Sequence, residues 1–184
     1  MARSFVAASS QYLQKDSGVL TGVPLTMTCR FYKLDLTSDT CLVQAVRLSG
    51  KSYIGLFARS TATNSNKIQG IISYTSVTAT IFNGSTYTAN AWHFAAFRCN
   101  SDTSRSIWYN EVSTADTTSQ TFISNMDSFS VGRWNHVTPA LYFNGYIAEV
   151  GTWNVALDDD ELKALSKGYT PLEIRPQSLT APLS

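Results

Sequence analysis

The carboxylate side chains are candidates for catalysis, because two carboxyl groups held close together can hydrolyse a glycosidic bond. The chain has four glutamates, Glu111, Glu149, Glu161 and Glu173, and they stand far apart in the sequence. The nearest acidic pair, Glu111 with Asp116, spans a stretch rich in serine and threonine. No local Ser-His-Asp or Cys-His motif for nucleophilic catalysis is present either. The sequence therefore predicts a protein that is not an enzyme.

Thiol and imidazole groups could bind a metal ion, but their spacing does not favour a metal site. Cys29, Cys41 and Cys99 form no CxxC pair, and His93 and His136 are not placed to complete a zinc site. We expect no metal and no cofactor. All three cysteines are expected to be reduced and packed in the core. A disulfide between Cys29 and Cys41 on adjacent strands is the alternative.

One short polar loop carries the most concentrated set of candidate binding residues. These are Arg133, Trp134, Asn135 and His136, followed by Val-Thr-Pro at 137–139. A large aromatic ring with hydrogen-bonding side chains beside it suits a sugar, and loops often carry binding residues. Trp108 and Tyr109 are neighbours in a strand, so one should face outward, and Tyr109 joins the candidate ligand-binding set. The alternative is that Trp134 only covers an edge of the fold.

The elements that must position these residues are nearly all strands. Residues 25–34 (LTMTCRFYKL) alternate, with every second residue from Leu25 facing a core and Thr26, Thr28 and their successors facing solvent. Similar runs occupy 41–48, 53–59, 67–75, 77–82, 92–99, 105–111 and 128–134. Turn sequences such as Asn-Gly-Ser at 83–85 separate them. Many short strands without a βαβ rhythm predict one antiparallel, all-β domain.

Residues 142–165 change from a strand to the one helix that we predict. After the Asn144-Gly145 turn, the expected alternation puts Tyr146, Ala148, Val150 and Thr152 on one face and Ile147, Glu149, Gly151 and Trp153 on the other. Asp158 and Glu161 then have the spacing of a capping box, which predicts a helix at about 159–167 that ends at Gly168. Leu162 and Leu165 share one face, so the helix should dock on the strands. The acidic run 158–161 is therefore interpreted as a helix start, with a surface cation site as the alternative.

The C-terminal segment 169–184 holds three of the five prolines, which predicts an extended arm rather than a helix or a central strand. The arm is expected to be separate from the domain at 1–168. Leu172, Ile174 and Leu179 are its candidate apolar anchors for docking on a partner. Alternatively, the arm packs back on its own sheet.

Charge and hydropathy exclude two classes of partner. The formal net charge is +1 and no run of lysine or arginine occurs, so no nucleic acid is expected. The apolar runs are too short to cross a bilayer, so no membrane is expected. The first ten residues, MARSFVAASS, contain no apolar segment of signal-peptide length, so we expect no secretory signal.

Four segments resemble the laminin-G-like, concanavalin A-like lectin-glucanase superfamily. They are NAWHFAAF (90–97), SIWYNEV (106–112), FSVGR (129–133) and FNGYIAEVGTWNVALDDDELKAL (143–165). The resemblance covers about residues 1–168 and implies an antiparallel jelly-roll β-sandwich with one short C-terminal helix. It also implies that Trp92 and Trp153 are core residues.

The departures from the family pattern bear on its chemistry. Calcium-binding members have acidic residues where this chain has Ser9-Ser10-Gln11 and Ala148, so the resemblance implies no calcium site. Glucanases on this fold have a Glu-x-Asp-x-x-Glu pattern, and no glutamate here has an aspartate two residues later. A non-catalytic binding or structural module is therefore expected, with a glucanase-like glycoside hydrolase as the alternative.

The segment 169–184 resembles parts of laminin-G-like proteins of tailed bacteriophages. That resemblance implies a decoration or fibre-type protein on the virion surface, assembled in the bacterial cytoplasm. Its partners would be other virion proteins, further copies of itself, or a cell-surface glycan.

Overall fold

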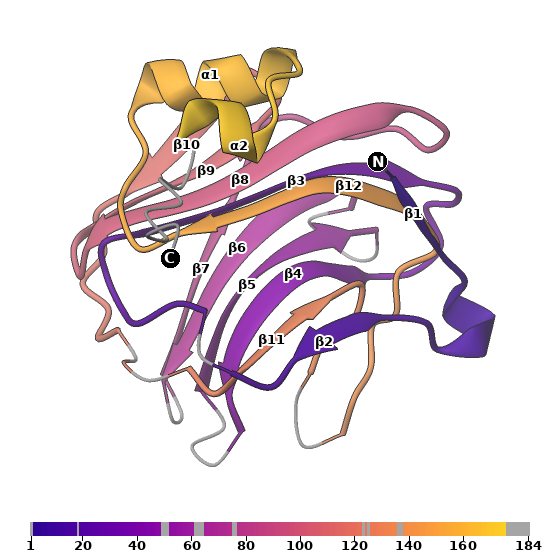
Figure 1. Cartoon of the computed structure of the whole chain (residues 1–184), viewed down its shortest axis with the longest axis horizontal. Coiled ribbons are helices and arrows are strands. Elements are labelled where there is room, and N and C mark those ends of the chain that lie inside the picture. The colour runs from indigo at the N-terminus through magenta and orange to yellow at the C-terminus, as the bar shows by residue number, and fades with distance from the viewer. Residues whose placement is uncertain are drawn as a thin grey trace, which may run out of the picture.

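Over the residues that the structure describes, the chain folds into two antiparallel six-stranded sheets packed face to face (Figure 1). The computed structural model describes residues 2–17, 19–48, 52–60, 65–74, 77–122, 124, 126–135 and 138–175. Sheet A has the strand order β1 (Arg3–Phe5), β12 (Gly145–Trp153), β3 (Leu25–Lys33), β8 (Trp92–Ser101), β9 (Ser104–Tyr109) and β10 (Val112–Asp116). Sheet B has the order β2 (Leu13–Lys15), β11 (Ser128–Val131), β4 (Thr40–Arg47), β5 (Ser52–Arg59), β6 (Lys67–Tyr74) and β7 (Val77–Phe82). The predicted all-β jelly-roll sandwich is confirmed.

The core between the sheets follows the period of two in the strands. In β3, Met27, Cys29 and Phe31 are fully buried among residues of sheet B such as Leu42 and Ile54. The prediction that Thr26 and Thr28 face solvent was wrong, because both are fully buried on the outer face of sheet A. The segment after β12 covers Thr26, whose hydroxyl donates to the carbonyl oxygen of Val155 at 2.9 Å.

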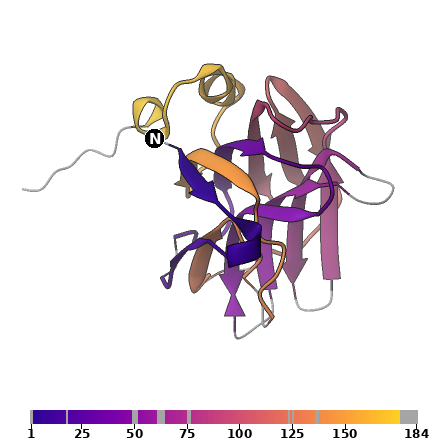
Figure 2. The ribbon, with the colours of Figure 1, turned by 90° about the vertical axis from the view of Figure 1, so that its right-hand side faces the viewer.

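Helix α1 (Asp159–Lys167) lies on the outer face of sheet A, over β8 and β9, as Figures 1 and 2 show. The capping box is confirmed: the Asp158 carboxylate accepts from the Glu161 amide at 2.8 Å, and the Glu161 carboxylate accepts from the Asp158 amide at 2.8 Å. Leu162 and Leu165 pack on Phe94 of β8 and other residues of the outer face. Each leucine buried in this way stabilises the fold by about 1.5–3 kcal/mol, which explains why so short a helix forms.

The arm begins with a short helix, α2 (Pro171–Ile174), so the prediction of a non-helical arm was wrong for these residues. Proline is allowed at the first position of a helix because the amide missing there would have no helical partner. The Glu173 side chain accepts from the Thr170 amide at 2.7 Å and fixes this start. Within the described part of the chain, no helix is long and apolar enough to cross a membrane.

The three cysteines are free and buried. Cys29 faces the central core from sheet A, whereas Cys41 belongs to sheet B and packs on its other face with Phe57 and Ile71. The alternative of a Cys29–Cys41 disulfide was therefore wrong, because β3 and β4 lie in different sheets. Burial raises the pKa of the Cys29 thiol far above its usual range.

Candidate functional site

A β-bulge in β12 shapes a pocket on the outer face of sheet A. The pairing of β12 with β3 shifts between Ala148 and Gly151, and Glu149 adopts a left-handed backbone with φ of 47°. Ile147 before the bulge and Val150 after it both pack toward the central core. The strict alternation expected for this strand was therefore wrong, since Ala148 and Glu149 both line the same outer pocket. Bulges commonly re-aim side chains beside functional sites.

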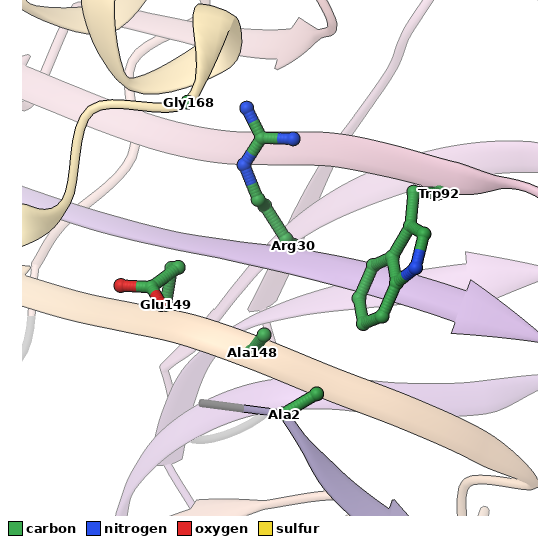
Figure 3. Close-up of a pocket in the computed structure, with 6 residues that line it drawn as sticks. All are labelled: Ala2, Arg30, Trp92, Ala148, Glu149 and Gly168. Atoms are coloured by element: carbon green, nitrogen blue, oxygen red, sulfur yellow. The ribbon is translucent and has the colours of Figure 1, made fainter.

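That pocket has a volume of about 350 Å³ and lies on the outer face of sheet A beside the end of α1. Its lining residues are Ala2, Arg30, Trp92, Ala148, Glu149 and Gly168 (Figure 3). Three of them have small side chains or none, which leaves the space open. The indole of Trp92 lies on one side, and the Arg30 guanidinium and the Glu149 carboxylate lie on the other. The pocket thus combines an aromatic surface with one cationic and one anionic group.

Arg30 is held in place by the C-terminus of α1. Its Nη2 atom donates to the carbonyl oxygens of Leu165 at 3.1 Å and Ser166 at 2.6 Å. The Leu165 carbonyl oxygen also accepts from the Gly168 amide at 3.2 Å, and a cation at this end of the helix is favoured by the helix dipole. Gly168 ends the helix with φ of 117°, a conformation that glycine adopts without strain. One wall of the pocket is therefore rigid.

Three aromatic side chains, which we call the aromatic row, lie beside the pocket on the same outer face. Tyr32 of β3 is directly opposite Trp92 of β8 on one side and Tyr146 of β12 on the other. The ring centres of Tyr32 and Trp92 are 5.7 Å apart and those of Tyr32 and Tyr146 are 5.8 Å apart. Trp92 is 45% exposed and Tyr146 is 40% exposed. The expectation that Trp92 is a core residue was wrong, because α1 covers β8 only from Phe94 onward.

The segment from Arg133 to Asn135, which belongs to the predicted ligand-binding set, lies on the outer face of the other sheet. Arg133 is buried, its guanidinium stacks 3.5 Å from the ring centre of Tyr12, and its Nη2 atom donates to Asn135 at 3.0 Å. The backbone amide of Asn135 donates to the side-chain oxygen of Gln44 at 2.6 Å. These contacts tie the loop to its neighbours. His136 lies outside the described residues, and a ligand-binding role for this loop stays a prediction.

Trp134 points onto sheet B. Its ring lies 6.0 Å from that of Tyr53, and it packs against the cluster of Cys41, Phe57 and Ile71. Its backbone pairs with Ala140, which closes the loop over this face. The geometry agrees with the alternative in which Trp134 covers the sheet.

Tyr109 is turned into the core, away from that loop. His93 Nε2 lies 2.9 Å from the Thr88 carbonyl oxygen, so Nε2 carries the proton, and Nδ1 accepts from the Tyr109 hydroxyl at 2.9 Å. Burial lowers the pKa of His93. Trp108, the other member of the pair, does face outward but is buried beneath α1. A ligand-binding role for Tyr109 stays untested.

The other three glutamates and Asp116 make structural contacts. Asp116 pairs with the buried Arg105 at 2.5 Å, and Glu111 lies 3.8 Å from the ammonium group of Lys167. Glu161 and Glu173 cap the two helices. Across the part of the chain that the structure describes, no three His, Cys, Asp or Glu side chains are grouped as metal ligands would be.

This chain belongs to the concanavalin A-like lectin/glucanases superfamily, whose family model matches residues 7–163. No curated protein matches it in sequence. The fold is shared with several solved structures. A SAP-like pentraxin from Limulus polyphemus is 11% identical, with a TM-score of 0.68 over 90% of this chain and 81% of that one.

Two further structures have carbohydrate ligands. Domain 4 of AbnA, a GH43 extracellular arabinanase from Geobacillus stearothermophilus in complex with arabinotriose, is 16% identical and has a TM-score of 0.70, covering 84% of this chain and 72% of that one. The CBM40 of the IT-sialidase from Ruminococcus gnavus, bound to α2,3 sialyllactose, is 16% identical, with a TM-score of 0.64 over 84% of this chain and 98% of that one. Identities this low show a common fold.

Proposed function

We propose that this protein is a non-catalytic carbohydrate-binding module and that the pocket beside Trp92 holds the sugar. The observation that carries the proposal is the half-exposed indole facing a pocket with Arg30 and Glu149. The apolar face of a sugar ring can stack on the indole, while its hydroxyls donate to the carboxylate and accept from the guanidinium. Pockets with mainly apolar walls and a few fixed polar groups are typical of small-ligand sites.

Two observations support binding without hydrolysis. Glu149 is the one acidic side chain among the described residues that line the pocket, whereas glycoside hydrolysis needs two carboxyl groups. The AbnA domain and the CBM40 were both solved with oligosaccharides. The alternative of a glycoside hydrolase gains no support from the other glutamates, which hold helices and strands.

The test is binding to a glycan array, followed by calorimetry on the best glycan with a Trp92→Ala variant. We expect the variant to lose at least tenfold in affinity, because one stacked aromatic contact of ordinary strength is removed. Tyr74→Ala is the matched control, since Tyr74 is 38% exposed on sheet B. Equal losses in both variants, or no glycan bound by the wild type, would refute the proposal. Release of reducing sugar that disappears in Glu149→Gln would favour the hydrolase.

We also propose that the module is a decoration or fibre-type component of a bacteriophage virion, assembled in the bacterial cytoplasm. The support is the resemblance of its C-terminal segment to phage proteins and the three buried free thiols, which suit a reducing compartment. Capsid or tail genes beside its gene, and its presence in purified particles, are the expected findings. Particles that lack the protein would contradict the proposal.

A further inference from the structure

We infer that the ligand is a soluble, linear and uncharged glycan chain, which runs from the pocket across the strands of sheet A over the aromatic row. The inference rests on the proposed function and adds the class of glycan and the path it takes. It assigns Tyr32 and Tyr146 to binding, although neither lines the pocket.

The size of the pocket favours a chain that continues outside it. About 350 Å³ is near the lower end of the range for small-ligand pockets, so it holds only a short piece of a glycan. The helix end at Gly168 and the Arg30 side chain close one side. Tyr32 lies two residues beyond Arg30 on β3. The aromatic row therefore begins on the side of Arg30 that faces away from the helix end.

The spacing of the row matches successive sugar units. Its three rings come from three neighbouring strands, so the row runs across the strands rather than along them. The steps of 5.7 and 5.8 Å between ring centres are comparable to the repeat of one sugar unit in an extended chain. A bound chain could therefore contact one ring per unit.

The tilt of the rings favours a single glycan chain over a crystalline polysaccharide as the ligand. The ring plane of Tyr32 is inclined by 59° to that of Trp92 and by 73° to that of Tyr146. A flat crystal surface needs coplanar rings, whereas a single chain can turn between one unit and the next. The tilted rings fit a soluble chain.

The composition of the row indicates an uncharged chain. The side chains that face one another across these strands are Ser4, Tyr146, Tyr32 and Trp92, and none of the four is charged. The charged groups Arg30 and Glu149 lie on the pocket side. An acidic chain would leave its carboxylates along the row without a cationic partner there, which costs free energy.

The experiment measures affinity against chain length. Oligomers of one to six units of the best glycan on the array are titrated into the wild type, Tyr146→Ala, Trp92→Ala and the control Tyr74→Ala, each checked for an unchanged melting temperature. We expect wild-type affinity to rise up to about three or four units. Tyr146→Ala should bind the shortest oligomers normally and lose about tenfold on the longer ones. The control should match the wild type throughout.

Three results would overturn the inference. Affinity that does not change beyond one unit, with Tyr146→Ala equal to the wild type, would confine binding to the pocket and leave the proposed function intact. Preferential binding of acidic oligomers or of insoluble crystalline polysaccharide would refute the class of glycan. A smaller particle mass in solution for Tyr146→Ala, with glycan affinity unchanged, would assign the row to contact between copies of this chain.

Discussion

At the scale of single residues, the alternation of strand side chains predicts which way Tyr32 and Tyr146 point but not that Glu149 faces the same way. In β3, Phe31 is in the core, so Tyr32 must face outward. In β12 the bulge adds one residue, and everything beyond it changes face. No local sequence signal marks this bulge, since Glu149 itself does not favour a left-handed backbone. We interpret the left-handed backbone at Glu149 as a sign of the proposed binding role, because strained residues cluster at functional sites.

Replacing Glu149 with asparagine tests that interpretation. Asparagine tolerates a left-handed backbone better than glutamate does. We therefore expect the free energy of unfolding to stay within about 1 kcal/mol of the wild type, while glycan affinity falls at least tenfold. Denaturant unfolding and calorimetry measure the two quantities. Glu149→Gln, which keeps the shape and the strain, is the comparison. A large loss of stability in the asparagine variant would show that Glu149 serves the fold instead.

At the scale of elements, α1 could be predicted and α2 could not. The signals for α1 are local, namely a capping box, two leucines on one face and a terminal glycine. For α2, the prolines of the segment predict an extended chain. Pro171, however, is the first residue of the helix, where proline fits. The helix forms because the chain returns to the sandwich. Ile174 packs against the outer-face cluster that includes Phe94 and Leu165. Arg175 donates to the Glu161 carboxylate at 2.6 and 2.9 Å.

Two truncated chains distinguish a role of the arm in the stability of the fold from a role in docking on a partner. A chain ending at Gly168 loses the Ile174 packing and the partly exposed Glu161–Arg175 pair, and should be destabilised by about 1–2 kcal/mol. That loss corresponds to a melting temperature about 2–8 °C lower. A chain ending at Arg175 should melt like the wild type, because both contacts remain.

The second truncation also tests the proposed partner docking. Leu172 is 72% exposed and remains available to a partner, whereas Leu179 lies outside the described residues and is removed. Loss of assembly in the chain ending at Arg175, at an unchanged melting temperature, would support docking by the last nine residues. Normal assembly would place the partner surface elsewhere on the sandwich.

At the scale of the whole molecule, the sequence predicts the class of fold but not which strands become neighbours. Cys29 and Cys41 belong to consecutive strands, β3 and β4, yet these strands lie in different sheets. Tyr32, Trp92 and Tyr146 are far apart in the chain, yet they form one row. The choice of neighbouring strands depends on contacts between distant parts of the chain, and the alternation within one strand does not encode that choice. The candidate site could therefore be found only once the sheets were assembled.

The packing of the two sheets also buries His93, so the protonation of this histidine depends on whether the sandwich is folded. It lies between rings from separate strands and loops, with centres 5.3 Å from Phe31, 6.2 Å from Tyr87 and 5.4 Å from Tyr109. Burial lowers its pKa, so the folded protein holds this histidine neutral. Protonation would turn Nδ1 into a donor, so the Tyr109 hydroxyl could no longer donate to it.

The sign of the resulting pH dependence follows from that lowered pKa. As the pH falls through about 6.5, the unfolded chain binds a proton at His93 that the folded protein does not yet bind. The free energy of unfolding should therefore decrease below about pH 7, by up to about 1.4 kcal/mol per pH unit, until the lowered pKa of the folded protein is reached. Denaturant unfolding between pH 5.5 and 8 measures this slope. His93→Gln should flatten it. An equal slope in the wild type and in His93→Gln would show that another group is responsible.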